Sequence, residues 1–173
     1  NYYNKIKYSN GDWNAKNWCE NKDVLIIGPS KKILKSEEIY NQVKKMNNLK
    51  IFSCNASPGF FKNLIDFHVA CHPIRILADF SRYKELKKKL IIPTQILDSR
   101  MKKKLYEVSY NDFGVSINEN AFHIEKDGAE IPFLNVLAYS LAIASSGMAK
   151  RVLLLGFDGY KKKDLRQKEM QKM

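Results

Sequence analysis

The sequence of 173 residues has no apolar stretch that could cross a membrane. A transmembrane helix needs roughly 18 consecutive apolar residues, and no run here approaches that length. Residues 1–22 also lack the hydrophobic core of a signal peptide. We therefore expect no membrane span.

Cysteine is scarce. Cys19, Cys54 and Cys71 are an odd number and do not show the paired spacing of a metal site. Two of them lie in apolar stretches, where cysteine usually acts as a small hydrophobic residue. Because structural disulfides persist mainly in oxidising compartments, this cysteine usage predicts a reducing, cytoplasmic setting.

Arginine is rare as well, although the net charge is +12. The positive residues are 25 lysines and 5 arginines, whereas base recognition relies on arginine and single-strand binding interleaves aromatic residues with the charge. The lysine runs at 87–89, 102–104 and 161–163 lie apart and carry no such aromatics. We expect a solvated lysine surface with a general attraction for anionic ligands, and we do not expect a nucleic-acid partner.

Several motifs that carry chemistry are absent. The sequence contains no GxGxxG or GxxxxGK[ST] phosphate loop, and no GxSxG, HExxH or CxxC. His68, Cys71 and His72 are close in sequence, but a strand followed by Pro73 would not align them as ligands, and no second ligand pair accompanies them. We predict no metal site and interpret the two histidines as structural.

The apolar content of 45% predicts a folded domain with a true core. Residues 24–27 form a continuous apolar run typical of a strand that is covered on both faces. A serine-capped helix at 36–46 and further strands at 50–54 and 66–70 follow with short links. Strand, helix and strand in this order form a βαβ unit, which requires a parallel sheet.

The second half of the chain continues this pattern. We expect helices at 78–88 and 97–106, a strand at 90–93, and either extended segments or a lid-like insertion at 107–131. A buried helix beginning at Pro132 and ending at Gly147 precedes a buried strand at 151–155. Residues 164–173 suggest a short charged helix. The predicted fold is therefore α/β: a three-layer α/β/α Rossmann-like domain with a mainly parallel sheet.

The domain organisation predicted from composition has two parts. Residues 1–22 are an aromatic and polar lead-in or linker that packs either on this domain or on a preceding one, and 23–173 form a single Rossmann-like domain. The chain begins with Asn1 rather than methionine, which suggests a domain excised from a longer chain.

Polar and glycine residues follow three of the predicted strands. In open parallel sheets, ligands bind outside the carboxyl ends of the strands, near the point where the strand order reverses. Glycine lets backbone N–H groups approach a phosphate, and a nearby lysine adds positive charge. The candidate ligand-binding residues are Gly28, Pro29, Ser30, Lys31, Asn55, Ser57, Gly156 and Asp158.

Each of these features also has a purely structural interpretation. The Gly28-Pro29-Ser30 stretch could be an ordinary strand-to-helix turn. Asn55 could fold a loop onto itself. Asp158, the candidate for a catalytic base, could instead hydrogen-bond loop amides. The residues alone leave these alternatives open.

Three stretches together carry a family resemblance: "DVLIIGPSKKI", "IFSCNAS" and "PFLNVLAYSLAIASSGMAKRVLLLGFDGY". They resemble the bacterial sialyltransferases and the flagellin-modifying glycosyltransferases, whose nucleotide-binding positions would match Gly28, Pro29, Ser30, Asn55, Gly156 and Asp158. The sequence departs from the sialyltransferases in two places. The long helix begins with Ile131-Pro132-Phe133 instead of a Ser-Gly pair, and no histidine follows His123.

A second group is similar in more detail. "IDFHVACHPIRI" and "GFDGY", followed by "DLRQKEM", resemble the carboxyl-terminal domain of bacterial aldolase-like proteins related to hydroxy-oxovalerate and hydroxymethylglutaryl lyases. Members of that group are often found in surface-polysaccharide pathways. The resemblance implies an upstream barrel domain that carries the lyase chemistry and its metal.

These observations lead to three hypotheses. The first is an accessory domain that binds a nucleotide or a CMP- or UDP-linked sugar beside such an aldolase-like protein in surface-polysaccharide biosynthesis. The second is a glycosyltransferase that uses a sugar-nucleotide donor, with Asp158 or a residue of 107–131 as base. The third is a non-catalytic docking or dimerisation domain. The sequence identifies neither the ligand nor the oligomeric state, so a homodimer and a catalytic role both stay open.

Overall fold

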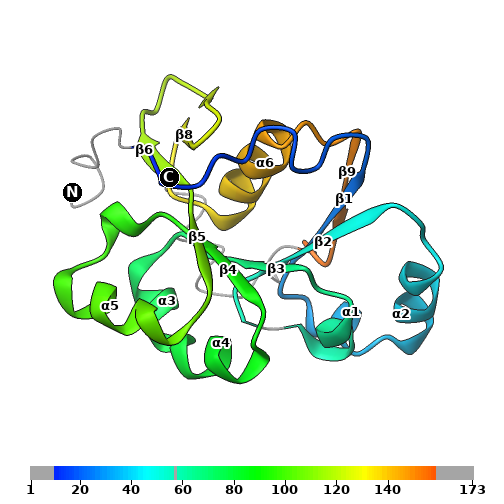
Figure 1. Ribbon diagram of the computed structural model, residues 1–173. Helices are drawn as coiled ribbons and strands as arrows, with labels where there is room; N and C mark the ends of the chain where they lie inside the picture. Colours follow the sequence, from blue (N-terminus) through cyan, green and yellow to red (C-terminus); the bar gives the residue numbers. More distant parts are fainter. Residues whose placement is uncertain (1–9, 57, 159–173) are drawn as a thin grey trace.

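The computed structural model describes residues 10–56 and 58–158. Its centre is a six-stranded sheet in the order β5-β4-β3-β2-β1-β9, in which every neighbouring pair is parallel (Figure 1). This arrangement confirms the predicted α/β class with a Rossmann-like sheet. The strands are β1 (Asp23–Ile27), β2 (Leu49–Cys54), β3 (Phe67–Val69), β4 (Lys89–Ile92), β5 (Tyr110–Asp112) and β9 (Arg151–Leu155).

The first strand shows why the sheet has two apolar faces. Successive side chains of a strand point to opposite faces. Val24 and Ile26 accordingly join one hydrophobic cluster, and Leu25 and Ile27 join the other. All four side chains are buried, as a continuous apolar run predicts for a strand covered on both sides.

Helices cover the sheet from both sides. In Figure 1, α1 to α5 lie below the sheet and α6 lies above it. Helix α6 is apolar around most of its circumference and buries Tyr139, Ala142, Ile143 and Ala144. The helices are α1 (Lys31–Leu34), α2 (Glu37–Lys44), α3 (Pro73–Ala78), α4 (Phe80–Leu86), α5 (Ser99–Lys104) and α6 (Val136–Ser146).

The segment 10–22 lies against the sheet beside α6. Trp18 stacks on Phe52 with ring centroids 5.6 Å apart and meets Phe67 edge-on at 4.5 Å. Trp13 contacts Trp18 edge-on at 5.4 Å, and Cys19 N–H donates to the Gly147 carbonyl. The described part of the aromatic lead-in therefore packs on this domain, because its indole rings complete the core. Residues 1–9 lie outside the described part of the chain.

The region 107–131 is extended, which was one of its two predicted forms. It contributes β5 to the main sheet and then forms a small sheet of β6 (Gly114–Ile117), β8 (Gly128–Ile131) and β7 (His123–Ile124), in that order. Strands β6 and β8 are parallel, whereas β7 and β8 are antiparallel. The small sheet packs on α6, so this region belongs to the body of the domain.

Three helix predictions need correction. The last helix begins at Val136, because the Asn135 side chain caps it by accepting from Leu137 N–H at 2.8 Å, so Pro132 lies before the helix. The helix predicted at 78–88 is interrupted at Asp79, the residue between α3 and α4. The helix predicted at 97–106 is shorter, since Asp98 caps α5 by accepting from Met101 N–H. In the first and third cases a side-chain cap decided the boundary.

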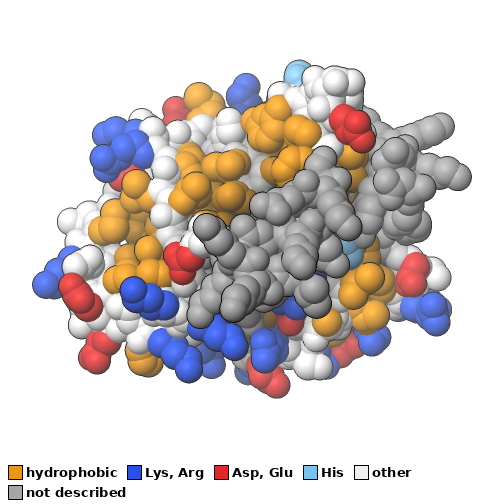
Figure 2. All heavy atoms as spheres, turned by 180° about the vertical axis from the view of Figure 1, so that it is seen from behind, with side chains coloured by type: hydrophobic (Ala, Val, Ile, Leu, Met, Phe, Trp, Pro, Cys, Tyr) orange, Lys and Arg blue, Asp and Glu red, His pale blue; other side chains and the backbone are white. Residues whose placement is uncertain are grey.

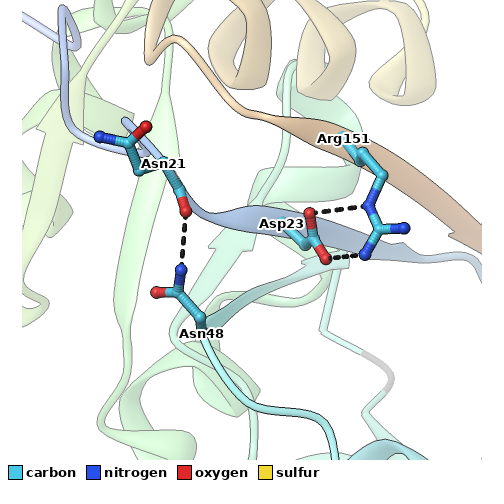
Figure 3. Close-up of polar contacts among 4 residues, drawn as sticks. All are labelled: Asn21, Asp23, Asn48 and Arg151. Carbon is cyan, nitrogen blue, oxygen red and sulfur yellow. Dashed lines mark hydrogen bonds and ion pairs between the residues drawn. The ribbon is translucent and has the colours of Figure 1, made fainter.

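Polar contacts join the amino ends of three neighbouring strands (Figure 3). The Arg151 guanidinium at the start of β9 donates to both carboxylate oxygens of Asp23 on β1, at 3.0 and 2.5 Å. The Asn48 side chain before β2 donates to the Asn21 carbonyl at 2.7 Å. Because Arg151 favours the ionised carboxylate, the pKa of Asp23 lies below its ordinary value. These contacts help to set the register between distant parts of the chain.

Within the described ranges 10–56 and 58–158, no helix is both long and apolar enough for a membrane crossing. The charged helix predicted at 164–173 lies outside these ranges, as does Ser57.

Candidate functional site at the β1–β9 rim

The strand order of the main sheet reverses between β1 and β9. From β1 the chain proceeds to β2, which pairs with one edge of β1. After β8 and α6 the chain returns to β1, and β9 pairs with its other edge. Ile27 is paired with both Ser53 on β2 and Leu155 on β9, so the loops after all three strands leave the same edge of the sheet. Ligands of open parallel sheets usually bind at such a reversal.

The loops after β1 and β9 are in direct contact. Gly28 N–H donates to the Leu155 carbonyl at 2.7 Å, and Ser30 N–H donates to the Gly156 carbonyl at 3.3 Å. The Ser30 hydroxyl donates to the Asp158 carboxylate. Residues 128 positions apart in sequence thus form one continuous rim.

The two glycines of this rim have a packing role. A Cβ atom on Gly28 would lie 2.6 Å from the Gly156 carbonyl oxygen, a distance that real side chains do not tolerate. Gly156 has a φ of +79°, which L-residues with side chains rarely adopt. The close approach of the two loops therefore accounts for both glycines, and a contact of their backbone with phosphate stays a prediction.

The remaining residues of the first loop face solvent to different degrees. Pro29 is exposed, as are Lys31 and Lys32 at the start of α1. Ser30 precedes α1, but its side chain makes no capping hydrogen bond, because its hydroxyl is directed to Asp158. The rim therefore presents a carboxylate and a hydroxyl on one side and two lysine side chains next to them.

Asn55 occupies the neighbouring strand end, directly after β2. It has a φ of +60°, the left-handed region. Its N–H donates to the Val69 carbonyl at 2.9 Å, and its carbonyl accepts from His68 Nδ1 at 3.1 Å and from Ser53 Oγ at 3.3 Å. The Asn55 side chain, which is half-buried, has no hydrogen-bond partner among the described residues. The alternative of an asparagine side chain that folds its own loop stays a prediction, because the partner two residues on would be Ser57, which lies outside the described part of the chain.

His68 is a core residue on β3, with 1% of its surface exposed. Its ring lies 5.7 Å from the Tyr83 ring. Burial lowers its pKa from an ordinary 6.5 to about 4, because the charged form is poorly solvated there. The described residues contain no cluster of three or more ligand side chains that could hold a metal ion.

The contact of His68 with Asn55 could not be inferred from the sequence, because it arises only when β2 and β3 pair. A buried strand histidine that follows a turn asparagine in the chain is not a recognised motif. The single feature of the sequence that could have singled out His68 is that it is a polar residue in an otherwise apolar strand.

Positive charge also surrounds a pocket of about 220 Å³ beside α4. Within it Lys84 forms an ion pair with Glu107. On the face seen in Figure 2, lysine and arginine side chains lie mainly around the border and are mixed with acidic ones. The pocket is lined by Tyr83, Lys84, Lys87, Lys88, Glu107, Val108 and Ser109.

Comparisons with known proteins address the fold. The sequence matches no family model and no curated protein. Among solved structures, it is similar to the MAf glycosyltransferase from Magnetospirillum magneticum AMB-1, with a TM-score of 0.61 and 15% sequence identity. The match covers 94% of this chain but 27% of that protein. At this identity the similarity establishes a shared Rossmann-like fold.

Proposed function

We propose that this domain binds a sugar nucleotide at the β1–β9 rim. The observation that carries the proposal is the contact between the Ser30 and Asp158 loops at the reversal of a parallel sheet. This is the place where Rossmann-like domains hold nucleotides. The structural similarity to a glycosyltransferase and the resemblance of the strand-end motifs to sialyltransferases support the same ligand class.

The rim residues suggest a division of roles. The Asp158 carboxylate is an acceptor suited to ribose or sugar hydroxyls, and a ligand hydroxyl could replace Ser30 as its donor. Lys31 and Lys32 would offset the charge of one or two phosphate groups. The Asn55 carboxamide can both donate and accept, and it would orient the base or the sugar.

Calorimetric titration with CMP, UDP and their sugar conjugates tests the proposal. We expect heat from one of these ligands, and binding about tenfold weaker in Asp158→Ala, the effect of one lost hydrogen bond to a charged group. Lys31→Ala should weaken binding as well. Lys103→Ala on α5 is a matched control that also removes an exposed lysine. No heat from the wild-type domain at millimolar ligand would refute the proposal.

Catalysis by the same site is a second candidate function. It is supported by the glycosyltransferase similarity and by Asp158, whose exposed carboxylate could accept a proton from an acceptor hydroxyl. The test is release of CMP or UDP from a donor in the presence of candidate acceptors. Turnover that disappears in Asp158→Asn, with donor binding retained, would support transferase activity. Binding without turnover would leave the domain as an accessory module.

The biological setting follows from the resemblance to aldolase-associated domains. In that setting the domain would work in the cytoplasm, in surface-polysaccharide biosynthesis, beside a barrel domain that carries lyase chemistry. The coding sequence upstream of Asn1 tests this point: a barrel there supports the accessory role, and its absence contradicts it. A docking or dimerisation role would instead appear as a stable dimer in light scattering without any nucleotide binding.

A further inference from the structure

Hydrogen bonds hold the backbone of Asn55, whereas its side chain has no hydrogen-bond partner within residues 10–56 and 58–158. The left-handed conformation of a non-glycine residue costs free energy, and asparagine often offsets that cost with a hydrogen bond from its own side chain. No such bond forms here among the described residues. Among the described residues, the contacts that hold this conformation are those of the Asn55 backbone with Val69, His68 and Ser53.

His68 makes the shorter of the two side-chain contacts to the Asn55 carbonyl, 3.1 Å against 3.3 Å for Ser53. A carbonyl oxygen accepts but cannot donate, so the nitrogen that faces it must carry the proton. Since burial keeps His68 neutral near pH 7, the ring has one proton, and it resides on Nδ1. The Tyr83 ring on α4 packs beside the imidazole, with the two ring centroids 5.7 Å apart.

We propose that His68 is a positioning residue: its Nδ1–H fixes the Asn55 carbonyl and thereby holds the Asn55 carboxamide ready for a ligand at the rim. The inference rests on the proposed sugar-nucleotide function for the identity of the ligand. The positioning itself depends only on contacts within the domain. Two experiments therefore separate a failure of the positioning from a failure of the function.

The first experiment needs no ligand. Long-range proton–nitrogen correlation spectra of the labelled wild-type domain at neutral pH should show His68 with its proton on Nδ1. In His68→Leu, amide exchange at Asn55 should accelerate about tenfold, as expected when one hydrogen bond that restrains the turn is lost. His68→Asn keeps a donor near the Nδ1 position and should restore slow exchange. A proton on Nε2 in the wild type would overturn the proposal, even if the leucine variant failed to fold.

The second experiment uses the nucleotide that binds the wild-type domain. Asn55→Gly and His68→Leu should each weaken binding by about tenfold, and the double variant should be no weaker than Asn55→Gly alone, because His68 acts through Asn55. His68→Asn should bind within about threefold of wild type, as a retained donor predicts. Additive losses in the double variant would overturn the positioning role. Absence of any binding by the wild type would refute the sugar-nucleotide function, and the spectroscopic result would still decide the role of His68.

Discussion

The Ser30 hydroxyl donates a hydrogen bond to the Asp158 carboxylate across the rim where the sheet reverses its strand order. The two residues are 128 positions apart, and they are brought together because β1 and β9 are neighbours. A ligand hydroxyl that binds Asp158 would have to compete with Ser30. Ser30→Ala removes the competing donor and keeps the Asp158 acceptor, so it is expected to raise the affinity of the domain for that ligand.

Gly28→Ala should destabilise the domain by about 1–3 kcal/mol, the usual cost of forcing an atom into packed surroundings. The added Cβ would lie 2.6 Å from the Gly156 carbonyl oxygen. Urea denaturation followed by circular dichroism measures the change. Lys31→Ala, at the start of α1 and exposed, is the control and should leave the midpoint unchanged. A Gly28→Ala variant as stable as wild type would mean that the loops can separate without cost.

Asn55 offers a test that separates backbone conformation from side-chain function. Asn55→Ala should lower stability by about 1 kcal/mol, because alanine adopts the left-handed region poorly. Asn55→Gly should fold with near wild-type stability, since glycine tolerates a φ of +60°. Thermal melts of the two variants provide the comparison. Equal losses in both would show that the side chain itself contributes to stability.

The stability of the domain should fall as pH is lowered from 6.5 toward 4. The pKa of His68 is depressed to about 4 in the folded state, against 6.5 ordinarily, so the unfolded chain binds the proton more tightly throughout that window. Integrated across this pH window, the free energy of unfolding falls by about 3 kcal/mol. The pKa of His72 is also lowered by burial and adds a contribution of the same sign.

Urea denaturation at several pH values between 7 and 4 measures this dependence. In His68→Asn, most of the slope should disappear, and the remainder should reflect His72 and the acidic groups. A wild-type profile that is flat across the window would contradict the buried, neutral state of His68.

The three cysteines should resist thiol reagents while the domain is folded. Cys19, Cys54 and Cys71 are free and buried, and burial raises the pKa of Cys19 and of Cys54 to about 12. Because the thiolate is the reactive form, a chromogenic disulfide reagent at pH 8 should label none of them in buffer and all three in denaturant. Rapid labelling in buffer would indicate that the core opens easily.

Much of the fold was predictable because local patterns agreed with the tertiary structure. The apolar run at 24–27 requires coverage on both faces, and the βαβ order requires parallel strands, so the sheet class followed from the residues. Helix ends were less predictable. Asn135 caps α6 three residues beyond Pro132, and both residues are acceptable helix starts when judged from the sequence alone.

The candidate site was likewise predictable only in part. The sequence pattern was enough to infer that Gly28, Asn55 and Gly156 each follow a strand. Their placement at one edge depends on β1 pairing with both β2 and β9, and the glycines turned out to serve loop packing.

The sequence by itself determined the class of the fold, five strands of the main sheet (β1 to β4 and β9) and the residues at their ends, since hydrophobic periodicity and turn chemistry are local properties. Only the tertiary structure decided that Ser30 meets Asp158 and that His68 supports Asn55. Contacts of that kind arise from strand pairing between distant segments, and no local pattern encodes which strand ends will be neighbours.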